Sequence, residues 1–244
     1  MSLRLRGITF VLAALHALVA PGSGLRAQAA AQPTRPDTLA RAVTCCPAQI
    51  EAYRAQDLTE PPPHGAILFI GSSIFRQWTN VVEHMSPLPA FNRAFGGSRT
   101  WEVLHYMDEI VLPYRPRVIV YYCGSNDVNA GESASAIAGR FREFAARVHA
   151  ALPETRVLFV SINRAPQKRA QWGVVDATNA LVRVYADSVV FADYLDVNPA
   201  LFDVRGAPRS ELYRPDSLHF LPAAYDEFAR IIRPAVARLW EGGR

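Results

Sequence analysis

Residues 66–75 read AILFIGSSIF, in which the apolar run 66–70 is followed by a glycine, two serines and two more apolar residues. The run has the length of one buried strand, and the glycine permits a tight turn from a strand into a helix. Four further apolar runs of strand character follow along the chain, at 91–95, 118–123, 157–162 and 189–192. The apolar run at 66–70 is therefore predicted to be the first of five strands.

Segments with helical spacing of apolar residues separate or follow these runs, at 101–112, 135–152, 176–186 and 223–240. Two of them show one apolar face at intervals of three or four residues: Ile137, Phe141, Phe144, Val148 and Leu152, and then Phe228, Ile231, Ile232, Val236 and Leu239. Short apolar strands that alternate with such helices predict a parallel sheet covered on both faces. One doubly wound α/β domain is expected over residues 64–244.

The segment before this domain divides into two parts. Residues 1–29 contain a basic start, an apolar run of 13 residues from Ile8 to Ala20 and an Ala-Gln-Ala ending, which is typical of a secretory signal peptide. The run is too short for a helix to span a bilayer of about 30 Å. We expect a secreted or periplasmic protein without a stable membrane anchor, with an uncleaved anchor as the alternative. We expect residues 30–63 to form a tether that contains a short helix at 47–56.

Charge gives no sign of a nucleic-acid or anionic-membrane partner. The formal net charge is +4, but residues 1–29 hold three arginines and no acidic residue. The remaining chain carries 23 basic and 22 acidic residues, so its net charge is close to zero.

Three cysteines are present, and their spacing predicts no metal site. Cys45 and Cys46 are adjacent in a polar segment, whereas Cys123 ends an apolar run. A disulfide from either of the first two to Cys123 is one interpretation. The other is that Cys123 is a buried free thiol of a strand.

Chemistry in open parallel sheets gathers where the strands end, and the residues there are polar. Gly71 is followed by Ser72 and Ser73, either of which would expose a hydroxyl or simply cap the next helix. The second apolar run is followed by Gly96 and Gly97, whose backbone would approach a ligand closely or form an ordinary turn.

Two more polar groups stand at the same edge of the predicted sheet. The third run leads into Asn126, whose carboxamide would cap a loop or donate to an oxyanion. Before the last helix come Asp216 and His219, three residues apart in a turn. A carboxylate in that position can hold an imidazole through one ring nitrogen and leave the other free to take a proton.

Together these blocks, in the order Ser, Gly, Asn, His, resemble the SGNH (GDSL-like) hydrolase family, in its bacterial branch with Gly-Ser-Ser at the first strand. The resemblance runs from about Ile67 to Phe228. It implies a flavodoxin-like three-layer α/β/α sandwich with a mainly parallel five-stranded sheet. Ser72 stands where the family name has Asp, a position that precedes the nucleophile.

By this resemblance Ser73 is the nucleophile, His219 the base and Asp216 the acid that orients it. The oxyanion hole would consist of the N–H groups of Ser73 and Gly97 and the side chain of Asn126. Such chemistry needs no metal or organic cofactor.

The implied function is hydrolysis of short-acyl carboxylic esters, with O-acetyl groups on carbohydrate as one substrate class. Arg164 and Trp172 follow the fourth apolar run and are predicted to line the substrate side, unless they are ordinary loop residues. The sequence leaves open an acyltransferase, a lysophospholipase or thioesterase on the same scaffold, and a non-catalytic glycan-binding module.

Overall fold

The computed structural model describes residues 46–242, so the predicted signal peptide and the first part of the tether lie outside the described residues. The described chain contains one sheet of five strands: β1 (Ile67–Gly71), β2 (Ala90–Asn92), β3 (Val118–Tyr122), β4 (Arg156–Val160) and β5 (Ala192–Leu195). Their spatial order is β2-β1-β3-β4-β5, and every neighbouring pair is parallel. The chain thus winds outward from β1 in both directions.

Helices connect the strands. The α-helices are α1 (Pro47–Thr59), α2 (Ser73–Arg76), α3 (Val81–Met85), α4 (Thr100–Ile110), α5 (Ser125–Asn129), α6 (Ala134–Ala151), α7 (Trp172–Asp187) and α8 (Pro222–Gly242). Short 3₁₀ helices are η2 (Leu112–Tyr114), η3 (Pro166–Gln171), η4 (Asn198–Leu201) and η5 (Ser210–Leu212). None of the helices among residues 46–242 is long and apolar enough to cross a membrane.

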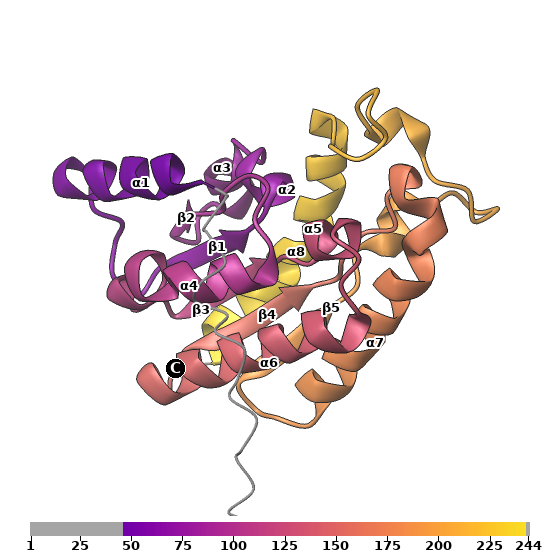
Figure 1. Cartoon of the computed structure of the whole chain (residues 1–244). Coiled ribbons are helices and arrows are strands. Elements are labelled where there is room, and N and C mark those ends of the chain that lie inside the picture. The colour runs from indigo at the N-terminus through magenta and orange to yellow at the C-terminus, as the bar shows by residue number, and fades with distance from the viewer. Residues whose placement is uncertain (1–45, 243–244) are drawn as a thin grey trace, which may run out of the picture. The chain divides into compact units, whose positions relative to one another are not determined.

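The sheet is the middle layer of three. Alternate side chains of each strand point to opposite faces, so Leu68 and Ile70 pack with α4, α6 and α7, whereas Ile67 and Phe69 pack with α3 and α8. Figure 1 shows α8, in yellow, behind the sheet and α6 in front of it. Strands β1 and β3 are buried along their whole length. The predicted doubly wound fold with a parallel five-stranded sheet is confirmed.

Several element boundaries differ from the predictions, among them the starts of β5 and α7 and the end of α1. The fifth strand begins at Ala192, where the predicted run ends, because Val190 lies in the turn before it and is 84% exposed. Helix α7 begins at Trp172, four residues before the predicted start, since the indole N–H of Trp172 donates to the Ala165 carbonyl and fixes that end. Helix α1 extends three residues beyond the predicted Gln56.

Helix α1 packs on the loop that follows β2. Arg93 of that loop is buried and pairs with Asp57 of α1. The Tyr53 hydroxyl donates to the Ala94 carbonyl at 2.6 Å, and the Gly96 N–H donates to the Gln49 side chain at 3.1 Å. The segment before the first strand therefore braces a loop at the carboxyl edge of the sheet.

Candidate active site

Ser73 is the first residue of α2, directly beyond the end of β1. Gly71 makes this turn possible: its φ is 135°, and a Cβ there would lie 1.8 Å from the Tyr122 carbonyl oxygen of β3. Ser72 is buried and stands at the N-cap position, but its side chain makes no capping hydrogen bond. Ser73 is partly exposed, so the second of the two predicted serines is the accessible one.

His219 and Asp216 lie beside Ser73 in the structure, although 146 positions of the chain separate Ser73 from His219. The Nε2 atom of His219 lies 3.0 Å from the Oγ of Ser73. The Nδ1 atom of the same ring lies 2.6 Å from Oδ2 of Asp216. The ring therefore contacts the serine with one nitrogen and the carboxylate with the other. The spacing predicted the contact with the carboxylate, and the family resemblance implied the one with Ser73.

Asp216 is held by the turn in which it lies. Its Oδ1 accepts hydrogen bonds from the backbone N–H groups of Leu218 (3.0 Å) and His219 (2.9 Å). Burial acts to raise the pKa of Asp216, but the hydrogen bonds from the His219 ring and from these backbone groups outweigh it and hold the pKa at about 2. The carboxylate is thus an ionised, fixed partner for the imidazole.

Gly97 lies on the loop after β2, which hydrogen bonds tie to the end of β1, and Asn126 lies in α5, which is hydrogen-bonded to that loop. The Ser98 hydroxyl and the Phe95 N–H both donate to the Gly71 carbonyl, at 3.0 and 2.9 Å. The Asn126 side chain donates from Nδ2 to the Ser98 carbonyl at 2.9 Å. One carboxamide hydrogen is used in this way, and the second has no hydrogen-bond partner among residues 46–242. Gly97 has a φ of 77°, a backbone angle that favours glycine.

Sequence reasoning missed the buried carboxylate beside Asn126. Asp127 is fully buried, and it accepts hydrogen bonds from the backbone N–H of Thr100 at 3.0 Å and from its hydroxyl at 2.5 Å. Arg140 lies 3.2 Å from the same carboxylate. Burial raises the pKa of Asp127, while the hydrogen bonds from Thr100 oppose that shift. This group fastens α5, which carries Asn126, to the start of α4, which follows the Gly97 loop.

A second histidine–aspartate pair exists that the sequence spacing did not indicate. The Nε2 atom of His84 lies 3.3 Å from Asp226, which joins α3 to α8. The Nδ1 atom of His84 accepts a hydrogen bond from the Trp78 indole at 2.9 Å. Both ring nitrogens therefore serve the packing of α3, and the pair is not arranged to serve Ser73.

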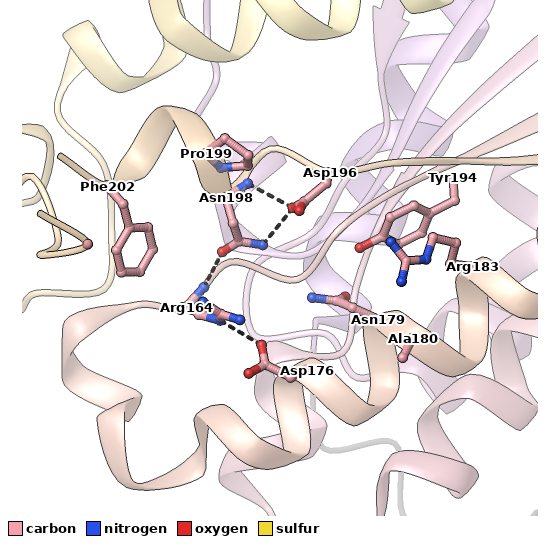
Figure 2. Close-up of a pocket in the computed structure, with 11 residues that line it drawn as sticks. Arg164, Asp176, Asn179, Ala180, Arg183, Tyr194, Asp196, Asn198, Pro199 and Phe202 are labelled. Carbon is pink, nitrogen blue, oxygen red and sulfur yellow. Dashed lines mark hydrogen bonds and ion pairs between the residues drawn. The ribbon is translucent and has the colours of Figure 1, made fainter. Parts of the chain in front are cut away.

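Arg164 lines a pocket, whereas Trp172 packs against a neighbouring aromatic ring. Arg164 lines a pocket of about 450 Å³ at the ends of β4 and β5, where it pairs with Asp176 at 2.6 Å, as Figure 2 shows. Asn198 accepts a hydrogen bond from the Arg164 backbone N–H at 2.8 Å and is itself hydrogen-bonded to Asp196. Neither Ser73 nor His219 lines this pocket. Trp172 packs edge-on against Phe202 and holds α7 in place.

The cysteine alternatives are resolved in part. Cys123 is buried and free, so a disulfide to Cys123 is wrong: its side chain is enclosed between β3 and the Ser98 loop. Cys46 is disulfide-bonded. Within residues 46–242, no three His, Cys, Asp or Glu side chains gather as a metal site would require.

The family model for the GDSL-like lipase/acylhydrolase family matches residues 69–227. The chain belongs to this family. The match begins within β1, ends within α8 and contains every residue of the site described above. Membership in the GDSL-like family identifies the protein as a carboxylic ester hydrolase. Among curated proteins, none matches the chain.

Solved structures of GDSL-like and other esterases share the fold. A GDSL-like lipase from Bacteroides thetaiotaomicron has a TM-score of 0.65 at 18% identity, with 78% of this chain and 98% of that chain covered. A carbohydrate esterase of family 3 from Talaromyces cellulolyticus gives 0.58 at 18%, covering 72% and 98%. An acetyl-xylooligosaccharide esterase from Geobacillus stearmophilus gives 0.61 at 14%, covering 73% and 97%. At these identities the likeness establishes the fold alone.

Proposed function

We propose that this GDSL-family enzyme hydrolyses short-acyl carboxylic esters through an acyl-enzyme formed on Ser73. The observation that carries the proposal is the continuous contact from Ser73 Oγ to His219 Nε2 at 3.0 Å and from His219 Nδ1 to Asp216 at 2.6 Å. A serine hydroxyl is a weak nucleophile, and an imidazole at hydrogen-bond distance is the group that activates it.

The reaction would proceed in two halves. His219 Nε2 takes the proton of Ser73 as Oγ attacks the ester carbonyl, and the imidazolium that forms is stabilised by the ionised Asp216. The tetrahedral intermediate collapses with proton transfer from His219 to the leaving alcohol, which leaves the acyl group on Oγ. Water, deprotonated by the same ring, then attacks the acyl-enzyme and releases the acid.

The developing oxyanion would be stabilised by three donors: the N–H groups of Ser73 and Gly97, and the carboxamide of Asn126. The second hydrogen of the Asn126 carboxamide supports this role, since the first is held by the Ser98 carbonyl. Each donor of this kind is worth about 10² to 10³ in kcat in serine hydrolases.

Acetyl esters of carbohydrate are the substrate class that we propose within the short-acyl range. Two structural neighbours are described as a carbohydrate esterase and an acetyl-xylooligosaccharide esterase. The site is also open, because the His219 and Asp216 side chains are 25% and 45% exposed. An open site can admit one acetyl group of a large, polar substrate without enclosing the rest.

Ser72 provides a matched control for the nucleophile. Ser73→Ala should abolish hydrolysis of p-nitrophenyl acetate and labelling by a fluorophosphonate, whereas Ser72→Ala should keep both. Turnover across a p-nitrophenyl series from acetate to octanoate, with and without acceptor alcohols, would then rank acyl lengths and detect transfer. Labelling that survives in Ser73→Ala and disappears in Ser72→Ala would reverse the assignment.

A further inference from the structure

Lys168 is a buried cation beside the proposed oxyanion hole. Its side chain is only 1% exposed, and its Nζ donates to the Ser125 carbonyl at 2.7 Å. Burial lowers the pKa of Lys168 to about 8, and the negative charge of Asp127 opposes that shift. No carboxylate lies within ion-pair distance of Lys168 among the described residues. Burying an ammonium group is costly, so a lysine in such a place needs a structural or functional reason.

The carbonyl that Lys168 binds belongs to the peptide group leading into Asn126. Holding this carbonyl fixes the plane of the Ser125–Asn126 peptide and hence the direction in which the Asn126 side chain leaves the backbone. A second contact comes from the next turn, where the Gln171 side chain donates to the Val128 carbonyl at 3.4 Å. Helix α5 has only five residues, so it depends on such outside contacts for its placement.

The same 3₁₀ helix, η3, also contacts the turn that carries His219. The backbone N–H of Gln167 donates to the Ser217 carbonyl at 3.1 Å. The start of η3 is fixed in turn by the hydrogen bond from the Trp172 indole to Ala165. Thus η3 lies between the proposed oxyanion donor, Asn126, and the proposed base, His219. Lys168 forms the buried contact between η3 and α5, the helix that carries Asn126.

We propose that Lys168 is a positioning residue for catalysis, which places the Asn126 carboxamide for the oxyanion by holding the Ser125 carbonyl. Lys168 touches neither Ser73 nor His219 in the structure, so it acts through Asn126. The inference rests on the proposed function, because only an ester hydrolase with Asn126 in its oxyanion hole gives this contact a catalytic consequence.

The test is a double-mutant cycle with Asn126. Lys168→Met keeps the length of the side chain and removes the donor; kcat on p-nitrophenyl acetate should fall by about 10- to 100-fold, with KM changed less than about threefold. The loss should stay below that of Asn126→Ala, since misplacing a donor costs no more than deleting it, about 10² to 10³. In the Asn126→Ala background, Lys168→Met should change kcat by less than about twofold, because the two residues act as one unit.

Arg169→Met is the control, because it removes one positive charge from an exposed position in the same 3₁₀ helix and should leave kcat unchanged. Rates are normalised to the enzyme that a fluorophosphonate labels to completion, so unfolded protein does not count. If Lys168→Met fails to fold, Lys168→Leu, which also lacks a donor, enters the same cycle with the same expectation.

Two results would overturn the inference. One is an equal fall of kcat in the wild-type and Asn126→Ala backgrounds, and the other is a loss confined to KM. Full turnover by Ser73→Ala would instead refute the proposed function, and that result is distinct from both.

Discussion

Replacement of Asp216 by asparagine tests the orientation of the proposed base. The carboxylate accepts from the His219 ring through Oδ2 and from two backbone N–H groups through Oδ1. An asparagine has one oxygen and one NH₂ group for these two places. If the oxygen faces the backbone donors, the NH₂ faces Nδ1, and the ring must adopt the tautomer with its proton on Nε2. That tautomer presents N–H to Ser73 and cannot take a proton from it.

The opposite rotamer is no better, since the NH₂ group would then face the N–H groups of Leu218 and His219. Both arrangements sacrifice a close hydrogen bond, so asparagine should lower kcat by about 10³ to 10⁴, which corresponds to about 4 to 5.5 kcal/mol in the barrier. His219→Ala should cost nearly as much as Ser73→Ala, because the three residues act as a unit. Residual turnover of the Asp216→Asn variant should remain above that of Ser73→Ala.

The assay is kcat and KM for p-nitrophenyl acetate, with circular dichroism to show that each variant is folded. A folded Asp216→Asn variant with kcat within tenfold of wild type would refute the reasoning. So would near-wild-type activity of His219→Ala, after which His64, His84, His105 or His149 would have to be considered as the base.

Three further results are expected. Because the pKa of Asp216 is held at about 2, this carboxylate should stay ionised at the pH of the assay, so kcat/KM should show no step between about pH 4 and 5; a step there would contradict this. Gly71→Ala should lower the free energy of unfolding in urea by more than about 3 kcal/mol, because its Cβ would meet the Tyr122 carbonyl at 1.8 Å. Gly206→Ala is the control, since it has a φ of 77° with open space around the added Cβ, and should cost only about 1 to 2 kcal/mol. We propose that the leader is removed on export, so mass spectrometry of protein from a secreting host should give an N-terminus near Ala30; an intact Met1 would contradict it.

The fold could be predicted because its strands are short, β1 and β3 contain only aliphatic, aromatic and glycine residues, and helices of clear period separate the strands. Every residue of β1 and β3 is buried, so the apolar run at 66–70 can be recognised as a buried strand from its residue types alone. The positions of Ser73 and His219 could be predicted for a related reason. Ser73 follows the glycine that ends the first apolar run, and His219 follows a Pro-Asp sequence typical of a turn.

What could not be predicted depends on tertiary contacts. Helices α2 and α5 have four and five residues, too few for an apolar period to show. Asp127 and Lys168 are both buried, yet charged residues in polar segments of the sequence are usually exposed. Val190 misled the prediction of β5, because an apolar residue in a turn is indistinguishable by type from one in a strand.

The contact between Ser73 and His219 spans 146 positions of the chain. The serine is fixed by β1 near the start of the domain, whereas the histidine is placed by a turn anchored on α8, whose Tyr225 hydroxyl donates to the Ile74 carbonyl. By the proposed mechanism, esterase activity therefore requires the last helix to dock on the first strand-to-helix turn. A chain that lacked α8 could form much of the sheet and still be inert, so recovery of turnover during refolding would report the final closure of the domain and not the formation of its secondary structure.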